Sequence, residues 1–506
     1  NVTYLLWMIM GYLLVQSILV VTLGRLGDIF GRVKIYNLGF VVFTLASIGL
    51  SFDPFQGTHG ALWLIGWRFV QAFGGSMLMA NSAAILTDAF PPGKRGMALG
   101  INQVAGISGQ FVGLLLGGLL SAWDWRAVFW INLPFGIFGT IWAYRSLKEI
   151  ATTRKARIDW LGNLFFAAGA GILLTAITFG IRPYRSDPTG WANPMVFGGL
   201  ILGVVLLTVF CFVESRVKDP MFQLSLFRIR AFAAGNVASL LGAIARGGLQ
   251  FMLVIWLAGV WLPLHGYDFT VTPLWAGIYM LPLTAGFLIA GPLSGMLSDR
   301  YGARPFATGG MIAAAASFFL LEQLPIDFSY PTFAALLLLN GLGMGAFASP
   351  NRAGVMNSLP ASDRGAGGGM NSTFQNSAQV LSIGIFFTLM IVGLSATLPT
   401  TLYQGLHAHG IDQATATQIA HYPPVSILFA AFLGYNPVQQ LVPEPALRAV
   451  NPANYSVLTG RSFFSNLISG PFRRGLHEAF LFAIIACLVA AVASWSRGRR
   501  YVDESD

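Results

Sequence analysis

The chain has 506 residues, of which 55% are hydrophobic and only 10% are charged, and its mean hydropathy is +0.66. Soluble domains carry about 25% charged residues, so this composition excludes a soluble enzyme and predicts a multi-pass membrane protein whose solvent is the lipid bilayer. The formal net charge of +10 is spread over short loops and not gathered on one soluble face, which argues against a nucleic-acid partner.

The apolar runs predict about thirteen membrane spans, each long enough to cross ~30 Å of hydrocarbon. No alternating strand pattern is present, so every span is expected to be helical and the fold class all-α. In chain order the predicted spans are 3–23, 36–52, 61–87, 98–120, 128–146, 160–180, 194–213, 232–262, 273–296, 305–322, 331–355, 367–397 and 476–495.

Most Lys and Arg residues fall on one side of these predicted helices, the side that holds segments 24–34 and 295–305. The positive-inside rule makes that side cytoplasmic and places the C-terminus there. An odd number of spans then puts Asn1 outside. Chains of this type normally begin in the cytoplasm, so we expect one further helix to precede Asn1.

One short segment occurs twice, as GRLGDIFGRVK at 24–34 and as GMLSDRYGARP at 295–305. Each copy follows an apolar run of membrane length. A second pair of segments, PPGKRGMALGIN at 91–102 and PASDRGAGGGMN at 360–371, repeats at nearly the same distance. Periods this long indicate two homologous halves and not a solenoid.

These features divide the chain into five parts. Residues 1–147 form an N-terminal bundle, and residues 148–230 hold a cytoplasmic linker and an extra helix pair. Residues 231–398 form the C-terminal bundle. Residues 399–473 are expected to be a partly helical external cap, followed by the last helix and a cytoplasmic tail at 474–506.

The chain resembles the 14-helix drug:proton antiporter branch of the major facilitator superfamily. Four segments carry the resemblance: the loop 24–34, the motif RFVQAFGG at 68–75, GQFVGLLLGG at 109–118 and WDWRAVFWINLPFG at 123–136. The resemblance implies two six-helix bundles with an extra pair between them, in the plasma membrane of a bacterium. It also implies a latch that closes the cytoplasmic side in one state. The expected latch residues are Gly24, Asp28, Gly31, Arg32, Gly295, Asp299, Gly302 and Arg304. The alternative for this cluster is a tight turn flanked by positive-inside anchors.

Arg68 and Arg246 lie inside apolar runs, where a cation is costly and indicates function by default. Arg68 falls on the fourth-helix motif of the family, whereas Arg246 matches no motif and is either a substrate contact or a structural cation. Residues expected to line the substrate or coupling cavity are Arg68, Gln71, Asn81, Asn102, Gln103, Arg246, Gln250, Trp256, Asn371 and Gln375. The spacing of Gly109, Gly113, Gly117 and Gly118 predicts a smooth helix face that acts as a packing pivot.

The sequence contains no P-loop and no enzyme motif, so neither ATP nor another cofactor is expected to supply energy. A proton gradient remains as the energy source, and it requires a titratable group in the cavity. All acids fall in loops or near helix ends. Three explanations stay open: a preceding helix supplies the group, Asp28 serves, or protons are not used. Leu114 stands where the antiporter motif usually has a proline, so the kink that the proline would supply is absent.

The sequence therefore predicts a monomeric secondary transporter, not an enzyme, that exports amphiphilic or hydrophobic small molecules against incoming protons. One alternative is a dedicated exporter of a single metabolite or lipid-like product. An alternative of another class is a transport-inactive membrane scaffold or receptor that acts through residues 399–473.

Overall fold

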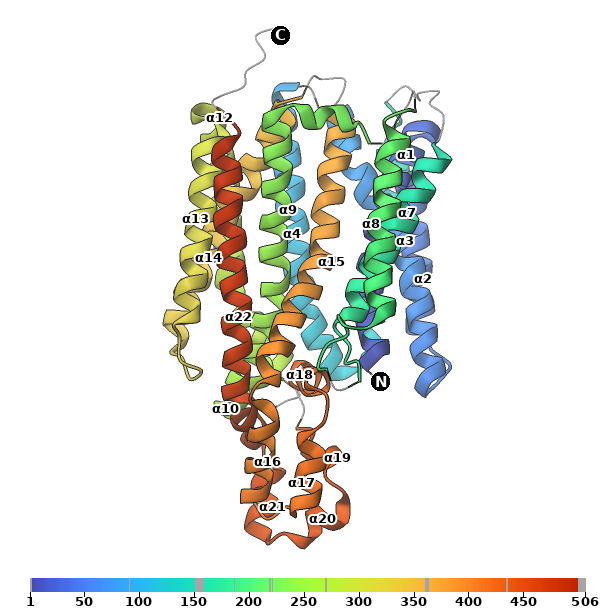
Figure 1. Cartoon of the computed structure of the whole chain (residues 1–506). Helices are drawn as coiled ribbons and strands as arrows, with labels where there is room; N and C mark the ends of the chain where they lie inside the picture. Colours follow the sequence, from blue (N-terminus) through green and yellow to red (C-terminus); the bar gives the residue numbers. More distant parts are fainter. Residues whose placement is uncertain are drawn as a thin grey trace.

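The structure is a computed structural model, and it describes residues 2–90, 92–150, 159–185, 187–217, 220, 222–268, 271–359, 364–433 and 436–498. Long helices run roughly parallel across the whole bundle, and a small group of short helices projects from one end (Figure 1). In these residues the only β-type pairing is an isolated bridge between Tyr184 and Asp187. The expected all-α membrane fold is therefore confirmed.

The N-terminal half consists of six helices that follow one another with short connections. They are α1 (Val2–Phe30), α2 (Arg32–Ser51), α3 (Gly57–Ala89), α4 (Pro92–Trp123), α5 (Ala127–Trp130) and α6 (Asn132–Ser146). The first helix continues well beyond the predicted end at residue 23, so segment 24–30 is helical and only Gly31 forms the turn.

The extra pair is α7 (Trp160–Gly180) and α8 (Pro194–Glu214), whose first turns are capped by the side chains of Asp159 and Asn193. Helix α7 packs against α1 of the first half and against α15 of the second half. A hydroxyl–amide hydrogen bond of 2.6 Å from Thr22 Oγ1 to Asn163 Oδ1 joins α1 to α7. The pair therefore lies along the seam between the halves.

The C-terminal half begins with the short 3₁₀ helix η1 (Leu224–Arg228) and is built from long helices. They are α9 (Arg230–Ile255), the π-helical turn η2 (Trp256–Trp261), α10 (Leu262–Leu264), α11 (Thr272–Tyr279), α12 (Leu281–Tyr301), α13 (Ala303–Glu322), α14 (Tyr330–Asn357), α15 (Arg364–Ser395) and α22 (Arg461–Ser496). Most of the large core cluster of buried side chains lies in this half.

Residues 398–458 contain six short helices outside the bundle. They are α16 (Leu398–Ala408), α17 (Gln413–Ala420), α18 (Pro424–Leu433), α19 (Val438–Leu441), α20 (Glu444–Ala449) and α21 (Pro452–Leu458). The predicted boundary of the cap at residue 473 is wrong, because α22 already begins at Arg461. Buried Phe464, Ile468 and Phe472 extend its apolar face into this stretch.

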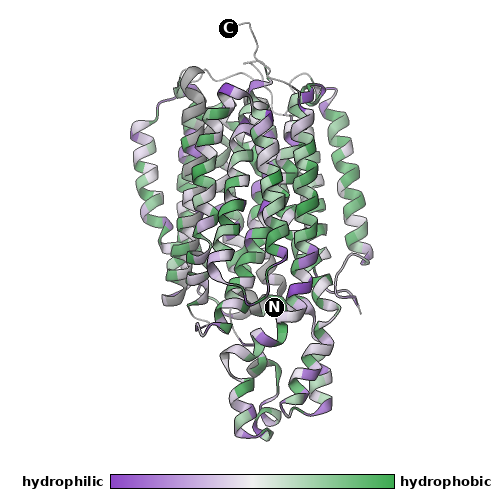
Figure 2. Cartoon of the chain, turned by 90° about the vertical axis from the view of Figure 1, so that its left-hand side faces the viewer, coloured by the Kyte–Doolittle hydropathy of each residue, from purple (hydrophilic) through white to green (hydrophobic). Residues whose placement is uncertain are grey.

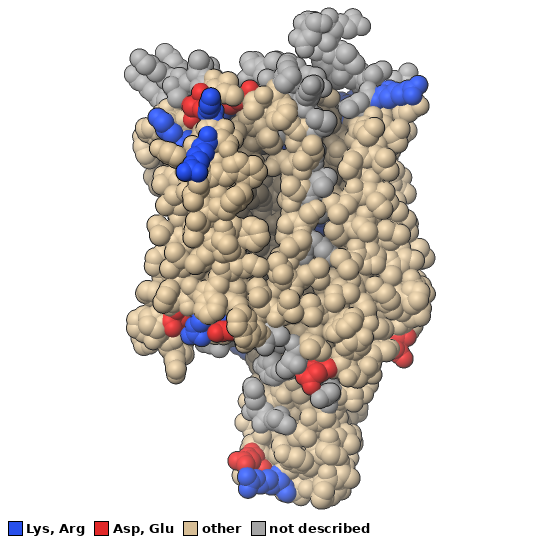
Figure 3. All heavy atoms as spheres, turned by 180° about the vertical axis from the view of Figure 1, so that it is seen from behind, with Lys and Arg blue, Asp and Glu red and all other residues tan. Residues whose placement is uncertain are grey.

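Twelve described helical segments are long and apolar enough to cross a membrane, and α4 adds a shorter apolar stretch, Ser108–Leu120. Together they match the thirteen predicted spans. Hydrophobic residues are spread along the whole bundle (Figure 2). On the face in Figure 3, the charged residues gather at the two ends of the bundle and at the tip of the cap, which leaves an uncharged band between them.

Candidate latch and central site

The duplicated segments form the same backbone turn. Helix α1 passes into α2 through Gly31 with φ 109°, and α12 passes into α13 through Gly302 with φ 87°. These values lie where residues with a Cβ are strained, so the shared glycines have a backbone reason. Gly24 and Gly295 each sit about two helix turns earlier, against Ala80 and Ser349 respectively.

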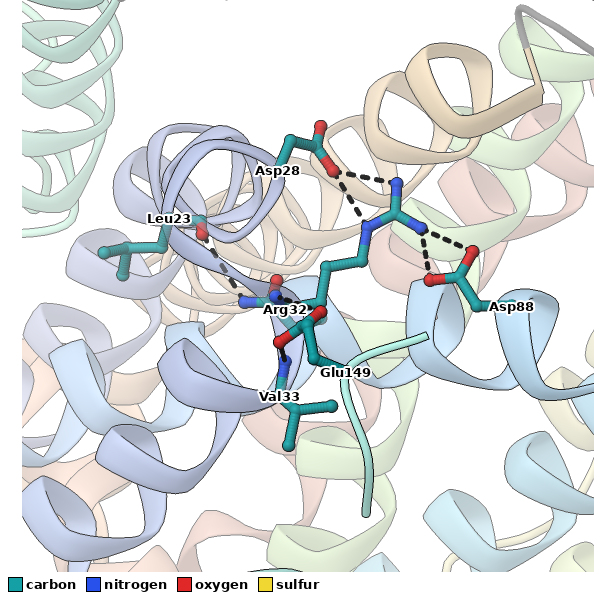
Figure 4. Close-up of polar contacts among 7 residues, drawn as sticks. Leu23, Asp28, Arg32, Val33, Asp88 and Glu149 are labelled. Atoms are coloured by element: carbon teal, nitrogen blue, oxygen red, sulfur yellow. Dashed lines mark hydrogen bonds and ion pairs between the residues drawn. The ribbon is translucent and has the colours of Figure 1, made fainter. Parts of the chain in front are cut away.

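In the N-terminal copy, Arg32 joins two aspartates (Figure 4). Its Nε lies 2.9 Å from Asp28 Oδ1, and its Nη1 lies 2.8 and 2.7 Å from the two oxygens of Asp88. Asp88 stands in the last turn of α3, so the guanidinium ties three helices together. The side chains are between 21% and 33% exposed, which limits screening by solvent.

Glu149, just after α6, adds a fourth element to this cluster. Its two carboxylate oxygens accept the backbone N–H groups of Arg32 and Val33, each at 3.0 Å. These groups open helix α2 and have no partner inside the helix, so an acid here also complements the helix dipole. The polar contacts of Asp28, Arg32 and Glu149 join α1, α2, α3 and the segment just after α6.

The C-terminal copy has a different side-chain chemistry. The Arg304 guanidinium lies 3.7 Å over the ring of Trp495 in α22, and its Nε has no hydrogen-bond partner among the described residues. The side chain of Asp299 lies outside the described residues. The predicted latch role of both hairpins stays a prediction.

Asn81 and Gly27 explain how α1 and α3 approach each other beside the latch. Asn81 is 1% exposed, and its amide donates to the carbonyls of Met77 at 2.9 Å and Leu23 at 3.4 Å. A Cβ at Gly27 would stand 1.8 Å from Asn81 Oδ1. The amide is therefore engaged in packing between these two helices.

Arg68 on α3 is held by neighbours from three helices. It donates to Gln71 Oε1 at 3.0 Å, and Gln71 in turn donates to Ser47 Oγ at 2.9 Å. The guanidinium also lies 5.4 and 5.5 Å from the ring centres of Tyr12 and Phe129. Amide and aromatic contacts thus stabilise this cation without a carboxylate.

Arg246 on α9 has a sparser environment. The span Arg230–Leu264 places it near the middle of the bilayer, where insertion of an arginine costs about 2.5–3.5 kcal/mol. Its guanidinium carbon lies 5.8 Å from the centre of the Phe287 ring on α12. In the described part of the chain, no hydrogen bond or ion pair reaches it. Gln250, one turn further on, is also partly exposed.

Asn371 and Gln375 of α15 belong to a polar network that joins this helix to α9 and α14. Gln375 donates to Asn371, which donates to Asn236 and Ser239 of α9. Ser239 also accepts from Asn351 of α14, and Arg497 after α22 donates to the Asn351 carbonyl oxygen.

Burial lowers the pKa of Arg497 to about 10. Its Nε and Nη1 have no hydrogen-bond partner among the described residues.

The remaining predicted site residues lie in various places. Trp256 is 2% exposed and packs on Phe328 and Phe333 in the core. Asn102 accepts from Ser82 at 3.2 Å, and the Gln103 side chain lies outside the described residues.

Along α4, a Cβ on Gly109, Gly113 or Gly117 would meet nothing within 4 Å, whereas one on Gly118 would stand 2.9 Å from Leu274 Cα. Only Gly118 therefore makes a close interhelical contact here.

The sequence predictions did not include Asp88, Glu149, Ser382 and Arg497. Asp88 ends the third predicted span on the same side as segment 24–34, and this signal was available in the sequence. Glu149 lies in a charged linker, and nothing local distinguishes it from its neighbours. Ser382 and Arg497 contact residues more than a hundred positions away, so only the tertiary structure reveals them.

Comparison with known proteins gives the family. Over 418 residues the chain is 31% identical to the methyl viologen resistance protein SmvA of Salmonella typhimurium (strain LT2), covering 82% of this chain and 80% of that protein. It is 27% identical to the tetracenomycin C resistance and export protein of Streptomyces glaucescens, covering 97% and 84%. It is also 27% identical to the riboflavin transporter RibZ of Clostridioides difficile (strain 630), covering 86% and 89%.

A solved structure shows the same fold at low sequence identity. A peptide transporter POT, crystallised in complex with sulfate, aligns with a TM-score of 0.54 at 15% identity and covers 87% of this chain and 88% of that chain. The family model of the Major Facilitator Superfamily matches residues 1–383. The chain, with its two related helical halves and duplicated hairpin, therefore belongs to the major facilitator superfamily and is a membrane transporter, not an enzyme.

Proposed function

We propose that this transporter exports amphiphilic or hydrophobic small molecules and is driven by proton entry. The observation that carries the direction of transport is the similarity over most of the chain to relatives named for resistance or export. The two hairpins fit alternating access, because each links the helices of one half into a unit that can move as a body.

Proton coupling requires a titratable group that can exchange protons during transport. The carboxylates of Asp28, Asp88, Glu214 and Glu322 stand in the last turns of their helices. Glu478 lies within α22, next to the His477 that pairs with Glu322 at the end of α13. Asp28 is paired with Arg32 and can change protonation only if that pair opens. The cytoplasmic position of the C-terminus and the monomeric state belong to the same proposal.

Everted membrane vesicles test both parts. Vesicles that contain the protein are expected to accumulate ethidium when their interior is acidified, and control vesicles are not. Nigericin, which removes the pH gradient, should abolish the accumulation. Accumulation that persists unchanged without a pH gradient would overturn proton coupling, and no accumulation of any cationic, neutral or anionic dye would overturn export.

A second candidate function is transport of one defined metabolite, and the similarity to a riboflavin transporter favours it. The two functions differ in competition. A broad exporter slows ethidium transport when unrelated dyes are added, whereas a dedicated transporter responds to riboflavin or one close analogue alone.

A further inference from the structure

A side chain from α15 bonds to the backbone of the helix turn that carries Arg246. The Ser382 hydroxyl donates to the carbonyl of Ile244 and accepts the N–H of Gly248 at 2.5 Å. These two backbone groups are one turn apart in α9, so Ser382 lies beside the turn that contains Arg246. Gly248 is required, because a Cβ there would stand 2.2 Å from Phe386 of α15.

This contact fixes the direction in which Arg246 points. Successive residues of a helix are ~100° apart, so Arg246 lies ~200° around the axis from both Ile244 and Gly248. Since those two residues face α15, Arg246 faces away from it. It shares this partly exposed face of α9 with Gln250 and Val254, whereas Phe251 packs on Phe387 of α15. The face combines a cation, an amide and apolar surface.

The charge of Arg246 is not balanced by the described protein. The ring centre of Phe287 on α12 lies 5.8 Å from its guanidinium carbon, and no carboxylate of the described residues pairs with it. Arg68, in comparison, has a hydrogen bond to Gln71 and two aromatic neighbours. On the face seen in Figure 3, the uncharged band of the molecule is hollowed near its middle. A guanidinium with free donors in a dry setting binds an anion strongly.

We propose that Arg246 binds the anionic group of transported substrates, and that these include aromatic amphiphiles with a single carboxylate or sulfonate. The carboxylate accepts N–H groups of Arg246, the aromatic part packs along Phe287 and Val254, and Gln250 offers a further hydrogen bond. The inference rests on the proposed export function and names one substrate class for its site.

Dansylglycine and dansylglycinamide form a matched pair of probes, because they differ only in a carboxylate against a neutral amide. Their transport is measured in proteoliposomes with the full chain and an imposed pH gradient. We expect Arg246→Gln to lower transport of dansylglycine at least tenfold and that of dansylglycinamide less than twofold. Arg246→Lys, which keeps the charge, should retain a substantial part of dansylglycine transport. Phe287→Leu should raise the KM for both probes about equally.

The control variant is Arg448→Gln on the external cap, which removes an exposed arginine and should change neither rate. Equal losses of both probes in Arg246→Gln and Arg246→Lys would overturn the proposal and make Arg246 a structural cation. Wild-type transport of dansylglycinamide without dansylglycine would overturn it as well, while leaving export intact. Transport of neither probe, together with failure of the ethidium assay, would overturn the export function itself.

Discussion

The N-terminal hairpin is held by an ionic cluster, whereas the C-terminal hairpin is held by aromatic contact and packing. Arg32 bridges Asp28 and Asp88, and Arg304 lies on Trp495. The repeats explain the difference. Aligning 24–34 with 295–305 puts Ala303 opposite Arg32, and aligning 91–102 with 360–371 puts Asn357 opposite Asp88. The two halves thus keep one backbone turn, but only the first keeps the charges.

The two hairpins show that a duplicated backbone turn can be kept while the charged side chains around it are lost. A glycine turn is needed wherever two membrane helices must reverse within one residue, because the alternative backbone is strained. An ion cluster at the membrane surface is different, since it can break and reform as the halves move. We therefore expect the hairpins to respond unequally to matched substitutions.

The largest difference between the two hairpins is expected when Arg32 and Arg304 are replaced. Arg32→Ala leaves two partly buried aspartates unpaired, which costs about 1.5–3 kcal/mol and corresponds to a tenfold to hundredfold change in an equilibrium. Arg304→Ala removes one cation–π contact of about 0.5–1 kcal/mol. Initial transport rates in everted vesicles, normalised to protein amount, check this. Equal losses in the two variants would show that the ionic cluster has no special role.

A smaller difference is expected for the residues that end α3 and α14. Asp88→Asn weakens one side of the Arg32 cluster but leaves Asp28 in place, so a loss of about 1–1.5 kcal/mol in cluster stability is expected. Asn357→Asp adds a charge to the C-terminal copy, where no arginine matches Arg32, and should not strengthen it. A double-mutant cycle between Arg32 and Asp88 measures the coupling. A coupling energy near zero would contradict the structure.

Replacing the two turn glycines should give a smaller difference between the hairpins, measured as loss of thermal stability. Gly31→Ala and Gly302→Ala each add strain of about 1–3 kcal/mol from a positive φ. The new Cβ at Gly31 would also stand 2.7 Å from Glu149 Oε2, whereas the one at Gly302 would meet nothing within 4 Å. Thermal unfolding in detergent should therefore show the lower Tm for Gly31→Ala. We expect the new Cβ to displace the Glu149 carboxylate, so adding Glu149→Ala to Gly31→Ala should lower the Tm little further. A large further fall in Tm would show that the carboxylate is not displaced.

The smallest effect is expected for Glu149→Gln. The amide oxygen can still accept one helix N–H, so the variant loses mainly the charge–dipole attraction of about 0.3–1 kcal/mol. Its transport rate should fall less than twofold. Raising the ionic strength should reduce the difference in transport rate between the wild type and the variant. A severe loss of transport would mean that Glu149 does more than cap α2.

Much of the fold could be read from the sequence because a bilayer imposes strict rules on chain segments. Predicted spans such as 160–180 coincide with a helix of the structure at both ends. The largest errors in the predicted boundaries are at 23 and 473, where a helix continues into less hydrophobic residues that still pack against protein. The apolar run alone does not show this continuation, since polar residues facing a neighbouring helix lower the hydropathy without ending the helix.

Residue types and their spacing alone determined that the chain crosses the membrane many times, that it consists of two related halves, and that glycine turns join their helices. The reason is that hydrophobic length, charge bias and positive φ act locally along the chain. Only the tertiary structure decided that Arg32 pairs with Asp88, that Glu149 caps α2 and that Ser382 bonds to the backbone of α9 beside Arg246. These contacts join residues at least 56 positions apart, and their energies depend on which helices pack together.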